Sequence, residues 1–187
     1  MEPIQGNVSI DAQNIMPIIK KWLYSDKDIF IREVVSNGCD AITKLRMVDS
    51  AAAQNCSIHV EVDKAARELR FTDDGIGMTE DEVKTNINQV AFSGAKSFME
   101  EYAKNEDKEN SGIIGHFGLG FYSVFMIADK VTIDTLSFRE GATPVRWESE
   151  DGMAFTMTEG TRTTRGTTIT LHVSEAESEF LEQWRVR

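Results

Sequence analysis

Residues 29–45 decide the fold of this chain and read Ile29-Phe-Ile-Arg-Glu-Val-Val-Ser-Asn-Gly-Cys-Asp-Ala-Ile-Thr-Lys-Leu45. Apolar residues recur in this segment with the period of a helix. Glu33, Asn37 and Asp40 follow one another at offsets of four and three, so a helix places them on one face. Two carboxylates and an amide on a largely buried apolar helix are costly without partners. We therefore expect this face to hold a ligand.

The composition of the 187-residue chain fits one domain with its own core, and the formal net charge is −11. Nucleic acid and anionic membranes bind basic surfaces, so neither is expected as the main partner. Cys39 and Cys56 suggest neither a disulfide framework nor a metal site, and Cys39 is expected to be a buried thiol. With no signal-like N-terminus and no apolar run of membrane-spanning length, we expect a soluble, cytoplasmic protein.

The segments after the helix predict a sheet. Residues 57–63 and 68–73 alternate between polar and apolar around a polar turn, which predicts a β-hairpin. Thr79 and Glu82 form a capping-box pattern at the start of another helix. Further strands are expected over 130–138, 144–149, 154–158 and 167–173, with helices over 121–128 and from residue 175. Hairpins outnumber crossovers, so the fold class is α+β: a two-layer α/β sandwich with a mixed, mainly antiparallel sheet and helices on one face.

The motif Asp73-Asp-Gly-Ile-Gly-Met78 ends a predicted strand. Gly75 and Gly77 allow a tight turn and a close backbone approach to a ligand. An aspartate at a strand end can accept a hydrogen bond from an exocyclic amine such as the 6-amine of adenine, and Met78 could pack on the base. A plain strand-to-helix turn remains an alternative for this motif.

A second glycine cluster, Gly115-His-Phe-Gly-Leu-Gly120, opens a predicted apolar helix after a charged segment, 98–110. Backbone N–H groups at a helix N-terminus bind anions, which suits the phosphates of ATP. The spacing is not that of a dinucleotide fingerprint, and Gly94-Ala-Lys-Ser97 does not complete a Walker A loop. ATP would therefore bind by another architecture.

On the first helix, Glu33 is the candidate general base that activates water near the γ-phosphate. A structural ion pair, with Arg32 or a lysine, is its alternative. Asn37 offers an oxygen for Mg²⁺, which prefers oxygen ligands. Asp40 and Lys44 continue the same face toward the nucleotide, although most lysines are simply solvated.

Together these segments resemble the nucleotide-binding N-terminal domain of the ninety-kilodalton heat-shock chaperones, especially the bacterial form, over essentially the whole chain. The resemblance rests on five motifs in order: residues 23–41, Asp73-Asp-Gly-Ile-Gly-Met-Thr79, Ser93-Gly-Ala-Lys96, Gly115-His-Phe-Gly-Leu-Gly-Phe-Tyr-Ser123 and Arg165-Gly-Thr167. It implies a Bergerat-type ATP-binding fold that spans residues 1–187 as one domain of a longer chaperone.

The resemblance also implies roles for single residues. Glu33 would activate the attacking water, Asn37 would hold Mg²⁺, and Asp73 would bind the adenine amine with help, through water, from Thr167. The other positions expected to contact ATP or ADP are Asp40, Lys44, Gly77, Met78, Asn86, Ser93, Gly94, Gly115, His116, Phe117, Gly118, Leu119, Gly120 and Phe121. Residues 93–120 would form a lid over the nucleotide.

The chain departs from the family pattern at Phe92, at Asn88-Gln89, at His116 and at Gly38-Cys39, which bears on phosphate contacts and lid movement. In the family, a middle domain supplies a catalytic arginine and a C-terminal domain dimerises. The isolated domain is thus expected to be monomeric and to hydrolyse ATP weakly. In the full-length protein we expect a homodimer that acts on client proteins.

Three other classes share this ATP-binding fold. Mismatch-repair ATPases and type II topoisomerases are expected to carry a basic surface for DNA, whereas this chain is acidic. Sensor histidine kinases need a phosphoacceptor histidine on an upstream helix, which is not found here. A nucleotide sensor that never hydrolyses ATP is a further alternative, and the candidate base Glu33 argues against it.

Overall fold

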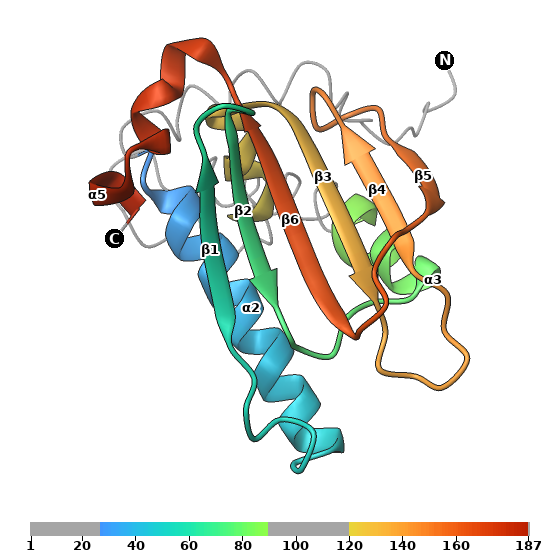
Figure 1. Ribbon diagram of the computed structural model, residues 1–187. Coiled ribbons are helices and arrows are strands. Elements are labelled where there is room, and N and C mark those ends of the chain that lie inside the picture. The colour runs from blue at the N-terminus through green and yellow to red at the C-terminus, as the bar shows by residue number, and fades with distance from the viewer. Residues whose placement is uncertain (1–26, 90–119, 187) are drawn as a thin grey trace, which may run out of the picture.

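The computed structural model describes residues 27–89 and 120–186. Its strands form one six-stranded sheet in the order β1-β2-β6-β3-β4-β5 (Figure 1). They are β1 Ile58–Asp63, β2 Glu68–Asp73, β3 Ala128–Leu136, β4 Val145–Ser149, β5 Thr156–Glu159 and β6 Gly166–Val173. Every pairing among these strands is antiparallel, which confirms the mainly antiparallel sheet expected from the sequence, with no parallel pair among the described strands. The reason is that β6 enters between β2 and β3 and runs opposite to both.

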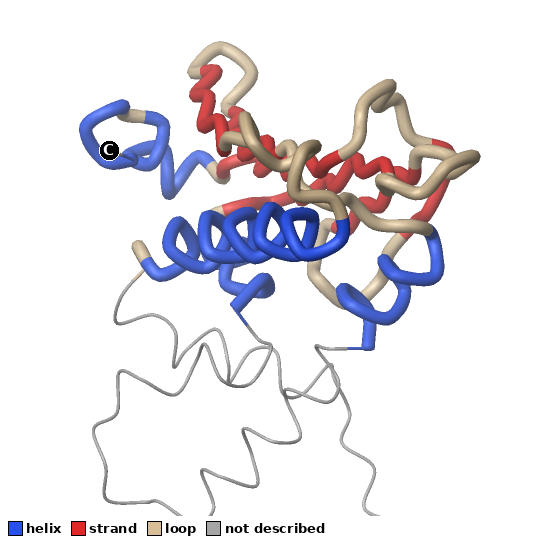
Figure 2. The backbone as a smooth tube through the Cα atoms, turned by 90° about the horizontal axis from the view of Figure 1, so that it is seen from below, coloured by secondary structure: helices blue, strands red, loops and turns tan. Residues whose placement is uncertain are grey.

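Helices form the second layer, which confirms the α+β sandwich. The long helix α2, Ile29–Val48, lies on the same side of the sheet as α3, Glu80–Val83 (Figure 2). The helix α3 continues into a π-helical turn, Lys84–Gln89. The helix expected over 121–128 is a 3₁₀ helix, Gly120–Met126, and the chain closes with a second 3₁₀ helix, Glu175–Leu181, and α5, Gln183–Val186.

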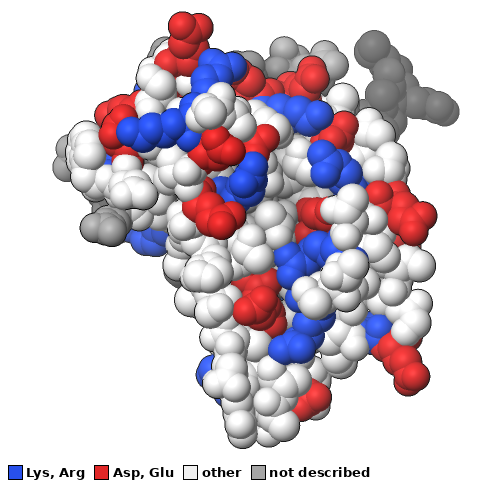
Figure 3. All heavy atoms as spheres, in the orientation of Figure 1, with Lys and Arg blue, Asp and Glu red and all other residues white. Residues whose placement is uncertain are grey.

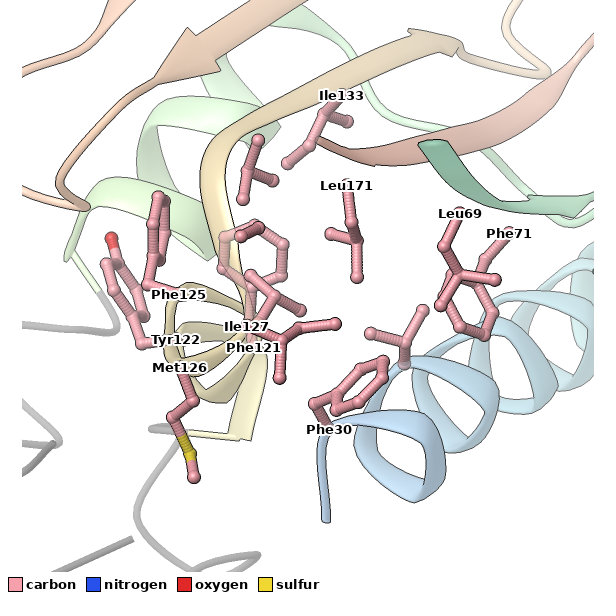
Figure 4. Packing of buried hydrophobic residues seen from close by; sticks show 14 of the residues in the cluster. Phe30, Leu69, Phe71, Phe121, Tyr122, Phe125, Met126, Ile127, Ile133 and Leu171 are labelled. Carbon is pink, nitrogen blue, oxygen red and sulfur yellow. The ribbon is translucent and has the colours of Figure 1, made fainter. Parts of the chain in front are cut away.

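The core lies between α2 and the sheet (Figure 4). On β2, Leu69 and Phe71 are buried while Arg70 on the other face is only half-buried, which confirms the alternation that predicted the hairpin. Phe30 of α2 is fully buried, and its ring centroid lies 6.4 Å from Phe71 and 5.3 Å from Phe180. Burying such a ring contributes about 2–3 kcal/mol, so this contact fixes the start of α2 on the sheet.

The capping box at α3 is confirmed. The Thr79 hydroxyl accepts the Glu82 N–H at 3.3 Å, and the Glu82 carboxylate accepts the Thr79 N–H at 2.8 Å. The loop from β2 therefore enters α3 with two of its free N–H groups satisfied.

The burial predicted for Cys39 is wrong, because its thiol is exposed. Gly38, one residue earlier, is the buried member of this turn and faces Ile58 of β1. One residue turns a helix by about 100°, so Cys39 points away from the sheet.

The face of the sheet opposite α2 is polar and carries both signs of charge (Figure 3). Arg70 pairs there with Glu68, and Lys130 and Arg146 both contact Glu148, at 3.2 and 3.4 Å. Such partly exposed pairs contribute little to stability, but they mix the charges across the face. As a separate observation, the described segments contain no helix that is long and apolar enough to cross a membrane.

The packing of Phe30 predicts a large effect of its truncation. Phe30→Ala should lower the free energy of unfolding by about 3–5 kcal/mol, since it leaves a cavity beside the rings of Phe71 and Phe180. Urea denaturation followed by circular dichroism measures this change. Met47→Ala, at an 82% exposed position of the same helix, is the control and should change stability by less than about 0.5 kcal/mol. Similar losses in both variants would contradict this account of the core.

Candidate functional site

A cavity of about 400 Å³ lies between α2 and the end of the sheet where β2 stops and β6 begins. Residues far apart in the sequence meet there. The predicted site residues that line it are Glu33, Asn37, Asp40, Lys44, Asp73, Gly77, Met78, Asn86, Gly120, Phe121 and Thr167. The remaining predicted positions, Ser93, Gly94, Gly115, His116, Phe117, Gly118 and Leu119, lie outside the described residues, as do Phe92 and most of the expected lid.

The polar side chains of α2 line the cavity next to one another, as their spacing in the sequence predicts. Asn37, Asp40 and Lys44 are exposed, and Glu33 is half-buried. The helix is thus less buried than its apolar sequence led us to expect, because its buried residues gather on the side that faces the sheet and the 3₁₀ helix. The carboxylates and the amide avoid a desolvation cost by opening onto the cavity.

Glu33 is held in close contact with the start of the 3₁₀ helix Gly120–Met126. A Cβ atom on Gly120 would lie 2.0 Å from Oε2 of Glu33 and 2.7 Å from its Cδ. No other residue fits at position 120 while Glu33 keeps this position. The last glycine of the second cluster therefore makes room for the candidate base.

Asp73 ends β2 at the base of the cavity and is only 8% exposed. Its Oδ1 accepts the N–H of Gly75 at 2.8 Å. Burial raises the pKa of Asp73 to about 6, although the backbone N–H groups of Gly75 and Thr167 and the charge of Arg162 lower it in part. This carboxylate has lost its hydration without gaining a full set of donors, so it is poised to accept a hydrogen bond from a ligand.

One cross-strand row of the sheet forms this base. Ile58, Asp73, Thr167 and Thr135 lie next to one another on β1, β2, β6 and β3. Thr167 is 7% exposed and lines the cavity beside Asp73. Because antiparallel neighbours in a row have Cβ atoms about 5 Å apart, the two polar side chains share one ligand-sized space.

The glycine loop after β2 is fixed to the end of β3. Gly77 has a φ of +64°, and a Cβ atom there would lie 1.9 Å from the carbonyl oxygen of Leu136. One residue further on, the N–H of Met78 donates to the Thr135 hydroxyl at 3.0 Å. The glycine thus permits the close approach that brings Met78 to the cavity wall.

Apolar residues that the sequence analysis did not name complete the cavity. Val34, Phe71, Ile133 and Ile169 lie along it. The alternation of the strands could have indicated Phe71 and the two isoleucines, because they share the face of the sheet toward α2. Ile58 belongs to the same alternation, and it reaches the cavity because Gly38 leaves space, with Ile58 Cδ1 only 2.9 Å from where a Cβ atom of Gly38 would stand.

Metal binding at this site would rest on few protein ligands. Within residues 27–89 and 120–186, no group of three His, Cys, Asp or Glu side chains could hold a metal ion. Mg²⁺ is commonly held by one or two protein oxygens together with the phosphates of a nucleotide. The amide oxygen of Asn37 on the cavity wall fits a metal that arrives with its ligand.

Comparison with known proteins identifies the family of the chain. Residues 29–179 match the family described as "Histidine kinase-, DNA gyrase B-, and HSP90-like ATPase". The chain is 44% identical to "Chaperone protein HtpG" of Porphyromonas gingivalis strain W83 over 187 residues, which covers 97% of this chain and 27% of the relative. Its identity is 45% with the protein of the same name from Bacteroides thetaiotaomicron, with the same coverage. With that of Cupriavidus taiwanensis it is 42% over 184 residues, covering 95% of this chain and 29% of the relative.

These similarities confirm the resemblance to the bacterial heat-shock chaperones that the motifs indicated. The chain spans less than a third of the length of the curated relatives it matches. The family match runs from the first residue of α2 to the 3₁₀ helix after β6, so it contains the whole sheet and the cavity. The chain belongs to the histidine kinase-, DNA gyrase B- and HSP90-like ATPase family.

Proposed function

We propose that this chain is the nucleotide-binding domain of an ATP-dependent molecular chaperone of the bacterial HtpG type, and that it binds Mg-ATP and Mg-ADP in the cavity beside α2. The observation that carries the proposal is the desolvated carboxylate of Asp73 at the base of the cavity, with Glu33 and Asn37 along its wall. One part of the cavity suits the amine of a base, and another suits phosphates and a metal ion.

Adenine would bind at the cross-strand row. Asp73 accepts a hydrogen bond from the 6-amine, Thr167 assists at the same edge, and Met78 packs on the ring as an apolar wall. The apolar residues of the cavity favour a flat ring over a hydrated group. Guanine has an oxygen at the 6-position, which would face the Asp73 carboxylate without a proton between them.

The phosphates would extend along α2 toward Gly120. Asn37 supplies a metal ligand, and Mg²⁺ neutralises phosphate charge when it is bound. Glu33 orients and deprotonates a water for attack on the γ-phosphate. Asp40, Lys44 and Asn86 contact the nucleotide or its waters. The lid over residues 93–120 remains a prediction of the family resemblance.

Partners of the whole protein follow from the same resemblance. The relatives are more than three times as long as this chain, which leaves room for a middle domain and a dimerisation domain. We propose that the domain docks on the chain's own middle domain, that the full-length protein is a homodimer, and that it acts on client proteins. The family also includes DNA gyrase B-like ATPases, but the net charge of −11 and the mixed charges of the open sheet face favour no DNA partner.

Asp73→Asn tests the adenine site. The amide places N–H donors where the adenine amine needs an acceptor, so affinity for Mg-ADP should fall roughly a hundredfold. Isothermal titration calorimetry measures the loss. Asp74→Asn is the matched control, because Asp74 accepts from the Ser57 hydroxyl at 3.2 Å and does not line the cavity. Equal affinity of the Asp73 variant and the wild type would remove the proposed base site.

The same substitution should stabilise the empty domain. Raising the pKa of Asp73 from 3.8 to about 6 disfavours the folded charged form above pH 6, a cost that fades as pH falls toward 4. Asp73→Asn removes this cost, so the free energy of unfolding at pH 7 should rise by about 1–3 kcal/mol relative to wild type. The gain should shrink at pH 4, where wild-type Asp73 is protonated in the folded state and near its midpoint in the unfolded state. Urea denaturation at the two pH values measures it, and a loss of stability at pH 7 would contradict the desolvation argument.

Affinity for Mg-ADP should depend on pH through the same group. The amine binds the carboxylate, so binding should be constant above pH 7 and weaken as pH falls through about 6, by up to about tenfold per pH unit. Calorimetric titrations from pH 5 to pH 8 measure this profile, and Asp73→Asn provides the baseline. A wild-type profile parallel to that of the variant would exclude Asp73 as the titrating group.

Glu33→Ala separates binding from hydrolysis. Affinity for Mg-ADP should stay close to that of the wild type, while phosphate release from ATP should fall by about a hundredfold or more, the usual contribution of a general base. A phosphate-release assay in the full-length protein measures turnover. Glu140→Ala, at an exposed loop position, should leave both properties unchanged. Normal turnover of the Glu33 variant would favour the non-hydrolysing sensor.

A further inference from the structure

Thr135 on β3 follows Thr167 in the cross-strand row, and it does not line the cavity. Its side chain is buried, at 1% exposed, and its hydroxyl has three polar neighbours. The N–H of Met78 lies 3.0 Å away, the carbonyl oxygen of Gly166 lies 3.1 Å away, and the hydroxyl of Thr167 lies 2.9 Å away. No motif in the sequence singles out this residue.

The directions of these hydrogen bonds follow from the capacity of a hydroxyl, which has one proton and two lone pairs. The Met78 N–H can only donate, so it occupies one lone pair of Thr135. The Gly166 carbonyl can only accept, so it takes the single Thr135 proton. Thr167 must then donate its own proton to the second lone pair of Thr135, because only this arrangement satisfies all three contacts.

These hydrogen bonds decide which groups the cavity presents to a ligand. With its proton committed to Thr135, the Thr167 hydroxyl presents only lone pairs to a ligand. Asp73, its neighbour in the same row, presents a carboxylate. Both polar groups at the base of the cavity are therefore acceptors, and the ligand edge that complements them carries donors, as an exocyclic amine does.

We propose that Thr135 is a specificity-determining, positioning residue: it fixes Thr167 as an acceptor and so makes the site select a 6-amino purine over a 6-oxo purine. The inference rests on the proposed function, because it concerns the base bound by the same cavity. Thr135 acts through Thr167 and does not touch the nucleotide. Loss of its hydroxyl frees the Thr167 proton, which can then turn toward a 6-oxo group.

The test compares two nucleotides that differ at one position, Mg-ADP and Mg-IDP (inosine diphosphate, with a 6-oxo group). Their dissociation constants are measured by calorimetry, with competition against ADP for the weaker ligand, in wild type, Thr135→Val and Thr135→Ser. Valine keeps the shape and removes the hydroxyl, whereas serine keeps the hydroxyl. Thermal unfolding of each variant checks that it is folded.

The preference for ADP over IDP should fall by about fivefold or more in Thr135→Val, the equivalent of one hydrogen bond. Thr135→Ser should keep the wild-type preference. Thr167→Val should lower the preference by itself, and adding Thr135→Val to it should change the ratio no further, since the two residues act as one unit. If Thr135→Val does not fold, Thr167→Val still tests the proposal. An unchanged preference for ADP over IDP in Thr167→Val would overturn it, because the Thr167 hydroxyl would then play no part in the selection.

A purely structural role of Thr135 predicts a different result. Loss of the Met78 contact alone would weaken ADP and IDP by the same factor and leave the ratio unchanged, which would overturn the proposal. Independent effects in the double variant would overturn it as well. If the wild type binds neither nucleotide, or binds ADP as well after Asp73→Asn, then the proposed function itself fails, and the result is distinct from a failure of the Thr135 inference.

Discussion

The packing of one helix against one end of the sheet sets the geometry of everything else in this domain. Near the N-terminus of α2, Phe30 packs between the rings of Phe71 and Phe180 and is fully buried. Two turns later Gly38 allows Ile58 and the end of β2 to come close. The helix therefore serves as core at one end and as cavity wall at the other, and its polar residues face the cavity because the apolar ones are committed to the sheet.

Much of this arrangement could be predicted from local patterns. The hairpin of β1 and β2, the capping box at Thr79 and the polar face of α2 each depend on residues within one or two turns or strands, where periodicity is informative. The features that were not predicted depend on contacts between distant segments. Cys39 is exposed because the neighbouring Gly38 is the residue that packs against Ile58 of β1, and every described strand pair is antiparallel because β6 enters between β2 and β3.

The candidate site shows the same division. The motifs around Glu33, Asp73 and Gly120 identified residues that share one cavity, since each motif carries its own chemical signal. Ile58 and Thr135 could not be found in this way. Thr135 meets Thr167 through the pairing of β3 with β6, and Ile58 reaches the cavity beside Gly38 of α2, whereas an isoleucine or a threonine in a strand is ordinary.

The cross-strand row of Ile58, Asp73, Thr167 and Thr135 limits how the gene can change in length. A strand that gains or loses one residue ahead of this row moves its side chains to the opposite face of the sheet. One inserted residue within β6 would turn Thr167 toward solvent and bring a neighbour between Asp73 and Thr135, although the composition would hardly change. The loop between β4 and β5, which contributes nothing to the row, is free of this constraint. Insertions and deletions should therefore accumulate around that loop and be excluded from the four strands that carry the row.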